Sequence, residues 1–339
     1  MAPGKSIDRR KSNTPDRIFI GAMILLLASA GVGLGQIRVR SDLVVVPVGV
    51  RDSDGETVTG LTKEDFTVLE DRRIQTISNF DSDPQRLSAA ILVDDGIAGI
   101  ELHRVASQLS AISAGITSED EVITFRYDRS VEKLSDFSND PKVLQKSFDA
   151  IKKVADGHTE EQHELITGGP GWLRSILGIF PDGSKGSSQN HVLHNAIYDA
   201  AMALKDRPSD RRRIVFIVSD GVASGPANVH TLAQNTELLL KSDIQVFAVS
   251  TDYARFGSYG TLTSYAAATG GDVYAGATDQ SLEHAFNRVT EQARHQYVLG
   301  YSSTNTKADS GIFRAIEVRI ERPNLKLTYR KGYRRYTAQ

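Results

Sequence analysis

The sequence predicts an α/β fold: a doubly wound, mostly parallel six-stranded sheet with flanking β extensions. Two observations lead to this prediction. From residue 87 to residue 296, apolar runs of strand length alternate with segments whose apolar residues recur at helical spacing. The first run, "SAAILVDD" at 88–95, is almost continuously apolar before its two acids, which is typical of a strand buried on both faces of a parallel sheet. Strands alternating with helices in this way imply right-handed crossovers and helices on both faces.

The first half of this region supplies three strands and two helices. Helical spacing marks "IELHRVASQLSAISAGI" as a helix, and "DEVITFRYD" and "SVEKLSDFS" are expected to be strands. Pro141 opens the next helix, "PKVLQKSFDAIKK", in the first-turn position that proline favours. Residues 155–190 then interrupt the alternation with glycines and prolines around Trp172, so we expect a long surface insertion with a short helix.

The alternation resumes after residue 190. The same two patterns predict, in order, the helix "LHNAIYDAAMALK", the strand "RRIVFIVSDG", the helix "ANVHTLAQNTELLLKS", the strand "IQVFAVST", the helix "SYGTLTSYAAATG", the strand "DVYAG" and the helix "SLEHAFNRVTEQARHQ". This completes a sheet of about six strands.

Two further regions are predicted to be β structure. Residues 36–86 form a small β module with the run "DLVVVPVGVRD" and the strand "DFTVLEDRRIQTISNF". Pro47 in the first run predicts an edge position or a bulge, because proline has no N–H to donate to a neighbouring strand. Residues 297–339 contain "YVLGYSS", "FRAIEVRIE" and "LKLTYRKGY". We expect this extension to pair with the N-terminal module or with the edge of the central sheet.

Charge and composition limit the classes of partner. The 339-residue chain has a formal net charge of −2, but residues 1–35 carry +3, which leaves −5 for the rest. A mildly acidic body argues against non-specific nucleic-acid binding, which requires a basic face. The chain contains no cysteine, which excludes disulfides, thiolate metal sites and a cysteine nucleophile.

Residues 1–35 are predicted to be a signal peptide or an N-terminal anchor. A basic leader precedes the uncharged stretch "IFIGAMILLLASAGVGLG" at 18–35. Small residues within it suit a signal peptidase, whereas a stretch of about 20 apolar residues can also span a bilayer. We therefore expect export to the periplasm, the cell envelope or the extracellular space. Membrane contact is expected only through this segment, if it is not cleaved.

Polar residues follow the predicted strands at places that a doubly wound sheet brings to one edge. Asp94 and Asp95 end the first strand, Asn195 lies in the helix after the insertion, and Ser219-Asp220-Gly221 ends a later strand. In such sheets, ligands bind outside the carboxyl ends of the strands, where the strand order reverses. The sequence therefore predicts a ligand-binding site at this edge.

These residues and the flanking text "NAIYDAA" and "IVFIVSDG" resemble the von Willebrand factor A (VWA) family over roughly residues 87–296. The resemblance implies the family's metal-ion-dependent adhesion site. There, Asp-x-Ser-x-Ser, a Thr and a further Asp hold Mg²⁺ through oxygen atoms, and a partner's carboxylate completes the shell. The wider layout, with "GLTKEDFTVLED" before the domain and "YVLGYSS" and "RKGY" after it, resembles the VWFA-related subgroup of acidobacterial-type exported proteins.

The candidate metal site departs from the family pattern at three positions. Asp94 matches the first Asp and Asp220 the last, but Gly96 and Ala98 stand where serines are expected, and Asn195 stands in place of the Thr. Mg²⁺ requires near-octahedral oxygen coordination, and two of the expected side-chain oxygens are missing. We therefore expect a degenerate site with no cofactor, or weak Mg²⁺ or Ca²⁺ binding with a dissociation constant on the order of 10⁻³ M.

The predicted function is a protein–protein interaction or adhesion module without catalytic activity. Its ligand-binding rim is formed by the strand ends and the segments beside them: Asp94, Asp95, Gly96, Ala98, His194, Asn195, Asp220 and Gly221. Asp95 is expected to face away from Asp94, because neighbouring residues of a strand point to opposite sides. The partner is an unknown protein. The alternative is a functional Mg²⁺- or Ca²⁺-dependent adhesion site that uses Asp94, Asn195, Asp220 and waters.

A hydrolase is the further alternative, and its motifs are incomplete. An aspartate-dependent phosphatase needs Asp-x-Asp, yet position 96 is glycine, and no G-x-S-x-G pattern surrounds Ser219. His191 and His194 are not accompanied by an HExxH pattern, so we expect solvated or helix-capping histidines rather than zinc ligands. The cluster Arg211-Arg212-Arg213 is expected to protect a sheet edge.

Overall fold

The structure is a computed structural model that describes residues 43–167, 191–223, 226–251, 259–276, 278–305 and 311–334. The predicted signal peptide or anchor lies outside the described residues, as does the part of the predicted insertion from residue 168 to residue 190. Within the described ranges, no helix is both long enough and apolar enough to cross a membrane.

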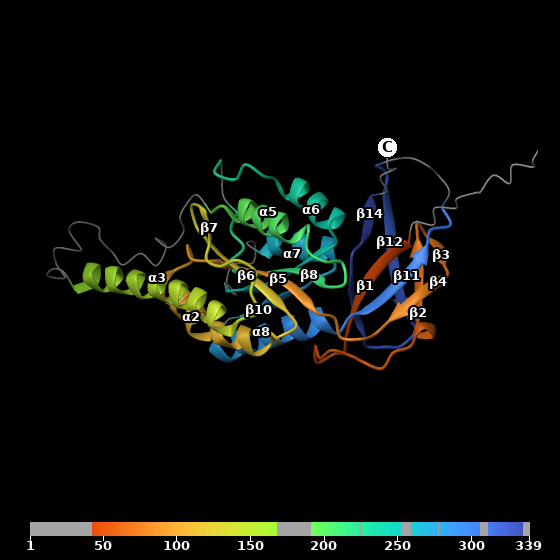
Figure 1. Cartoon of the computed structure of the whole chain (residues 1–339), viewed down its shortest axis with the longest axis horizontal. Helices are drawn as coiled ribbons and strands as arrows, with labels where there is room; N and C mark the ends of the chain where they lie inside the picture. Colours follow the sequence, from red (N-terminus) through yellow and green to blue (C-terminus); the bar gives the residue numbers. More distant parts are fainter. Residues whose placement is uncertain are drawn as a thin grey trace, which may run out of the picture. The chain divides into compact units, whose positions relative to one another are not determined.

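A six-stranded sheet forms the centre of the region that begins at Leu87 (Figure 1). Its strands lie in the order β10–β9–β8–β5–β6–β7, and all neighbours are parallel except β6 and β7. The bounds are β5 Leu87–Asp94, β6 Glu121–Tyr127, β7 Val131–Lys133, β8 Arg212–Ser219, β9 Ile244–Ser250 and β10 Val273–Ala275. From β5 the chain adds β6 and β7 on one side, and it then adds β8, β9 and β10 on the other side. The strand order therefore reverses between β5 and β8, and the carboxyl ends of these two strands flank the predicted binding position.

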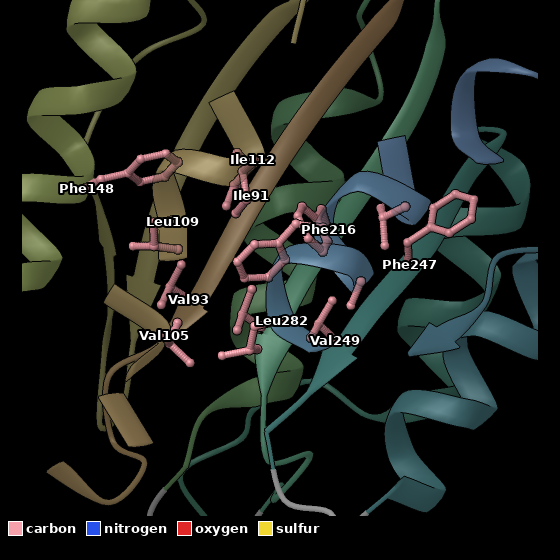
Figure 2. Close-up of a cluster of buried hydrophobic side chains, with 14 of the residues drawn as sticks. Ile91, Val93, Val105, Leu109, Ile112, Phe148, Phe216, Phe247, Val249 and Leu282 are labelled. Carbon is pink, nitrogen blue, oxygen red and sulfur yellow. The ribbon is translucent and has the colours of Figure 1, made fainter. Parts of the chain in front are cut away.

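Helices cover both faces of this sheet. On one face lie α2 (Gly99–Ala114), α3 (Pro141–Thr167) and α8 (Asp279–Arg294), and on the other lie α5 (Leu193–Leu204), α6 (Leu232–Lys241) and α7 (Tyr259–Thr269). Figure 2 shows how the first face is filled: Ile91 and Val93 of β5 lie near Leu109 of α2, with Phe216 of β8 beside Leu282 of α8. All of these side chains are at most 2% exposed. Both faces of β5 are buried, which explains its continuous apolar run in the sequence.

The fold corrects the predicted insertion at its beginning. We expected a surface insertion with a short helix of its own to begin at residue 155, but the preceding helix α3 continues without a break to Thr167. The segment "VADGHTEEQHELIT" has one glycine, Gly157, which a helix tolerates at a cost of about 1 kcal/mol. An amphipathic first half, with Ile151 and Ala155 fully buried, supports the helix from its N-terminal end.

The two predicted β regions form one β-sandwich domain. One sheet has the order β13–β1–β11–β4 and the other β14–β12–β2–β3, so each contains strands from both ends of the chain. The bounds are β1 Leu43–Arg51, β2 Phe66–Glu70, β3 Arg73–Gln75, β4 Ile77–Asp81, β11 Tyr297–Ser302, β12 Phe313–Ile320, β13 Lys326–Tyr329 and β14 Gly332–Arg334. The α/β region is therefore inserted into this domain. The described strands between Leu43 and Asp81 and those between Tyr297 and Arg334 are therefore halves of one module rather than two separate ones.

Two local predictions have different outcomes. Pro47 pairs with Val298 of β11, and the ladder to β13 begins one residue later at Val48. The proline therefore has a strand on one side only, as its missing N–H requires. The prediction that Arg211-Arg212-Arg213 protects a sheet edge is wrong, because β8 is a central strand and Arg212 is 9% exposed.

The motifs outside the α/β region meet at one buried carboxylate. Glu70 of "GLTKEDFTVLED" accepts hydrogen bonds from four donors of the C-terminal half: Tyr301 Oη at 2.9 Å, Ser303 Oγ at 2.6 Å, Arg314 Nη1 at 2.9 Å and Tyr333 Oη at 3.0 Å. Glu70 is 1% exposed and Arg314 is 3% exposed. This cluster joins β11 of one sheet to β2, β12 and β14 of the other, which gives these separated motifs a shared structural role.

Candidate functional site at the carboxyl end of the sheet

Three chain segments meet where β5, β6 and β8 end. They are the loop from Asp94 to Ala98, the segment from His191 to Asn195 at the start of α5, and the turn from Ser219 to Gly221. The strands β6, β5 and β8 are neighbours in the sheet (Figure 1). Because parallel strands end at the same edge, Asp94, Asp128 and Asp220 come together there.

Asp94 is completely buried, and its two carboxylate oxygens both accept hydrogen bonds. The Gly96 N–H donates to Oδ1 at 3.1 Å, and the Ser219 hydroxyl donates to Oδ2 at 2.7 Å. Ser219 in turn accepts the Gly221 N–H at 2.9 Å, so the turn after β8 is tied to the end of β5. Burial raises the pKa of Asp94, and the nearby charge of Asp220 adds to this effect, although the interaction with His191 opposes both.

His191 lies inside this cluster with no exposed surface. Its Nδ1 is 3.6 Å from Asp94 Oδ1 and 3.8 Å from Asp128 Oδ1. The interaction with Asp94 raises the pKa of His191; burial acts against it, and the charges of Asp94, Asp220 and Asp128 add to the increase. The expectation of a solvated or capping histidine is therefore wrong for this residue, because the fold places its ring between carboxylates.

The space beside Gly96 is already filled. A Cβ atom built on Gly96 would lie 2.4 Å from Asp128 Oδ1 and 2.8 Å from His191 Cε1. Real Cβ atoms do not approach other heavy atoms this closely, so a serine at this position would displace one of the two side chains. The side chains of Asp128 and His191 therefore occupy the space that a serine side chain at position 96 would need.

Asp95 turns away from Asp94 and is held by an arginine. Arg126 Nη1 donates to Asp95 Oδ2 at 2.8 Å, and the same guanidinium binds Glu132. Asp95 is 7% exposed; burial raises its pKa, and the charge of Arg126 only partly offsets that effect. Its carboxylate is therefore committed to a structural ion pair on the outer side of β5.

Asn195 holds the loop that follows the β8 turn. Its amide oxygen accepts the backbone N–H groups of Val229 at 3.0 Å and His230 at 3.3 Å, and its Nδ2 donates to the Ala227 carbonyl at 2.9 Å. Asn228 completes the junction by accepting the backbone N–H of His194 at 2.9 Å. The oxygen and the nitrogen of the Asn195 amide are therefore both hydrogen-bonded to the backbone of this loop.

The remaining rim residues are His194, Asp220, Gly221 and Ala98. The Nδ1 of His194 lies 2.8 Å from the Tyr265 hydroxyl, so His194 and His191 point to different partners. Burial lowers the pKa of His194. Asp220 accepts the Val222 N–H at 2.8 Å in a local turn. Gly221 has φ of 80°, a left-handed conformation that favours glycine.

The sequence matches no model of a known family, and it matches no curated protein. The chain is similar to the solved structure of a von Willebrand factor type A protein from Catenulispora acidiphila, with a TM-score of 0.44, 8% identity, and coverage of 88% of this chain and 75% of that one. It is also similar to BatB from Bacteroides thetaiotaomicron, with a TM-score of 0.39, 12% identity, and coverage of 61% and 98%.

A third similar structure is proximal thread matrix protein 1 from the mussel byssus, with a TM-score of 0.41 and 11% identity. This match covers 64% of this chain and 49% of that one, so it spans about half of the mussel protein. The central sheet has a single antiparallel strand at one edge and helices on both faces. The α/β region therefore has the doubly wound, mostly parallel six-stranded sheet that the sequence predicts.

The side chains at this edge of the sheet do not fit a divalent cation. Mg²⁺ and Ca²⁺ need several free oxygen ligands, and Mg²⁺ needs them in octahedral geometry. Here both oxygens of Asp94 and the oxygen of Asn195 accept hydrogen bonds from the chain, and Gly96 and Ala98 offer no side-chain oxygen. Among the described residues, no group of three or more His, Cys, Asp or Glu side chains is placed to hold a metal ion.

Sequence reasoning missed two residues that shape this site. Asp128 directly follows β6, so its position at a strand end was a usable signal once β6 was placed beside β5. Asn228 gave no such signal, because it lies in a loop and acts through two contacts that depend on the fold. It accepts the His194 N–H and donates to the His191 carbonyl at 2.8 Å.

Proposed function

We propose that this protein is an exported, non-enzymatic protein–protein interaction module whose VWA domain binds its partner without a metal ion. The proposal rests on one observation: the side-chain oxygens predicted to bind a metal are already hydrogen-bonded within the chain. The Asp94 carboxylate is buried and hydrogen-bonded at both oxygens, and the Asn195 oxygen accepts two backbone N–H groups. No metal ion is therefore present whose coordination shell a partner carboxylate could complete. Docking relies instead on the protein surface around these residues.

Two exposed apolar side chains support docking at this rim. Ile100, in the first turn of α2 after the Asp94–Ala98 loop, is 75% exposed. Val229, in the loop held by Asn195, is 76% exposed. Burial of such an aliphatic side chain against a partner contributes about 1.5–3 kcal/mol.

The burial of the candidate nucleophiles at the strand ends supports a non-enzymatic role. Asp94 and Ser219, the two candidates at the strand ends, have no exposed surface. The Ser219 hydroxyl donates to Asp94 and accepts the Gly221 N–H, so it serves as a buried structural link that a substrate does not reach. We expect purified protein to show no phosphatase or esterase activity above that of an Asp94→Asn variant, and activity that depends on Asp94 would contradict this role.

The interaction is tested by capture from envelope extracts, with and without EDTA. We expect the partner to be retained in EDTA and lost when Ile100 and Val229 are both replaced by aspartate, because the change places charges on the docking surface. The matched control is Ile74→Asp, which changes an equally exposed residue (73%) on β3 of the sandwich domain. Loss of the partner in EDTA, or its retention by the double variant, would contradict the proposal.

Export follows from residues 1–35 and needs a separate test. We expect mass spectrometry of protein recovered from cell fractions to find it outside the cytoplasm. A mature N-terminus near residue 30 or 35 would identify cleavage, and a retained N-terminal segment would identify an anchor. Recovery of the full chain from the cytoplasm alone would contradict export.

A further inference from the structure

We infer that the imidazole of His191 takes the place of a divalent cation at this site and thereby keeps the carboxylate cluster of Asp94, Asp128 and Asp220 free of metal. The inference rests on the proposed metal-independent function and adds His191 to the features that produce it, beside the hydrogen-bonded oxygens and the missing serines. It also predicts that metal binding is blocked by a side chain and is recovered when that side chain is removed.

The position of the ring is the first argument. His191 Nδ1 lies between Asp94 Oδ1, at 3.6 Å, and Asp128 Oδ1, at 3.8 Å. A ring nitrogen that carries hydrogen directs positive charge at these oxygens, as a metal ion does. Arg126 binds Asp95 and Glu132 instead, and Arg129, which is 76% exposed, reaches the cluster only at its outer oxygen, with its Nε 3.8 Å from Asp128 Oδ2.

The backbone around His191 is fixed from both sides, which is the second argument. The Asn228 side chain donates to the His191 carbonyl at 2.8 Å, and the Val192 N–H donates to the Asp128 carbonyl at 2.9 Å. The ring is fully buried. It is therefore a packed component of the site and not a mobile group that a cation displaces at low cost.

The filled volume is the third argument. The direction in which a serine at position 96 would extend is blocked by Asp128 Oδ1 at 2.4 Å and by His191 Cε1 at 2.8 Å. Glycine at 96 and histidine at 191 are thus sterically coupled. The glycine makes room for the ring, and the ring occupies the space that a hydroxyl ligand would need.

The test is to remove the ring. His191→Ala vacates a space larger than one water, about 30 Å³, which is lined by two carboxylate oxygens. We expect this variant to bind Mn²⁺ with a dissociation constant on the order of 1 mM, as sites with few charged ligands do. Addition of about 10 mM Mn²⁺ is then expected to raise its Tm by about 2–4 °C. Wild-type protein is expected to show no such rise, and the free Mn²⁺ signal in electron paramagnetic resonance measures binding directly.

The controls separate the site from its surroundings. His194→Ala removes the same side chain three residues later, beside Tyr265, and is expected to gain no Mn²⁺ binding. In the His191→Ala background, Asp128→Asn should abolish the gain, whereas Asp95→Asn should keep it, because Asp95 faces Arg126.

Gly96→Ser tests the steric coupling without changing His191. Alone it should destabilise the protein and lower the Tm, because the new side chain clashes with Asp128 and the ring. Combined with His191→Ala, it should lower the Tm less, and the added hydroxyl should tighten Mn²⁺ binding.

The outcomes distinguish this inference from the function on which it rests. Mn²⁺ binding by wild-type protein equal to that of His191→Ala would overturn both the inference and metal independence. Absence of binding by folded His191→Ala, or a Gly96→Ser Tm equal to that of wild type, would overturn the inference and leave the proposed function intact.

Discussion

Glu70→Ala is expected to lower the free energy of unfolding by about 3–5 kcal/mol, because it leaves the buried guanidinium of Arg314 without its carboxylate partner. The same change removes the acceptor of the Tyr301, Ser303 and Tyr333 hydroxyls. These donors come from both sheets of the sandwich domain, so the loss acts on the contact between them. Urea unfolding followed by circular dichroism measures the effect.

Two further variants define the role of the Glu70 charge. Glu70→Gln keeps the volume but presents an NH₂ group to donors, and we expect it to lose most of the same stability. Glu317→Gln is the matched control on β12, where an exposed glutamate binds Arg319 at 2.7 Å. Its unfolding midpoint is expected to equal that of wild type. A wild-type midpoint for Glu70→Gln would show that shape alone, and not charge, holds the cluster.

Acid titration gives an independent measure of Glu70. Burial acts to raise its pKa, but hydrogen bonds from Ser303, Tyr301, Arg314 and Tyr333 outweigh burial and hold the pKa below its usual value of about 4.5. Because the folded pKa is below the unfolded pKa, the stabilisation is complete above about pH 4.5 and is lost as the pH falls through the folded pKa. The stability of wild type should therefore decrease more steeply in acid than that of Glu70→Gln.

Asp94→Ala is expected to lower the free energy of unfolding by an amount in the same range, about 3–5 kcal/mol. The reason is that Asp94 is a buried structural residue. Its carboxylate accepts hydrogen bonds from the Gly96 N–H and the Ser219 hydroxyl and lies beside His191, and all of these groups stay buried when it is removed. Thermal and urea unfolding of the purified variant measure the change.

Asp220→Ala provides the comparison at the same edge of the sheet. Asp220 is half-buried, and its described hydrogen bond is to the Val222 N–H of its own turn, so we expect a loss of about 1 kcal/mol or less. Equal losses for the two variants would contradict the structural role of Asp94. An increase in stability for Asp94→Ala would do so more strongly, because removal of a strained binding residue stabilises a protein.

More of the fold than of the site could be predicted from the sequence. The strands β5, β6, β8 and β9 appear in the sequence as apolar runs because both of their faces are buried, and the helices appear through apolar spacing. The missing hydroxyls at Gly96 and Ala98 were also visible, since they depend only on residue identity. Neither pattern contains information on how side chains from distant segments pack.

The sequence could not show those features of the site that depend on such packing. Asn195 has an oxygen that suits a metal, but the loop at 227–230 uses it. His191 appeared as one of two closely spaced histidines, but only its packing against Asp94 and Asp128 reveals its position. The arginines at 211–213 suggested an edge, but β8 acquires neighbours on both sides from β5 and β9.

The sequence by itself determined the alternation of strands and helices, the acids at strand ends and the absence of serine oxygens at 96 and 98, because these are local properties of residue type and spacing. The tertiary structure alone decided that two terminal β regions form one domain and that a histidine lies among the acids. The physical reason is distance along the chain. Ser219 donates to Asp94 across 125 residues and Arg314 to Glu70 across 244, and no local pattern records contacts of that range.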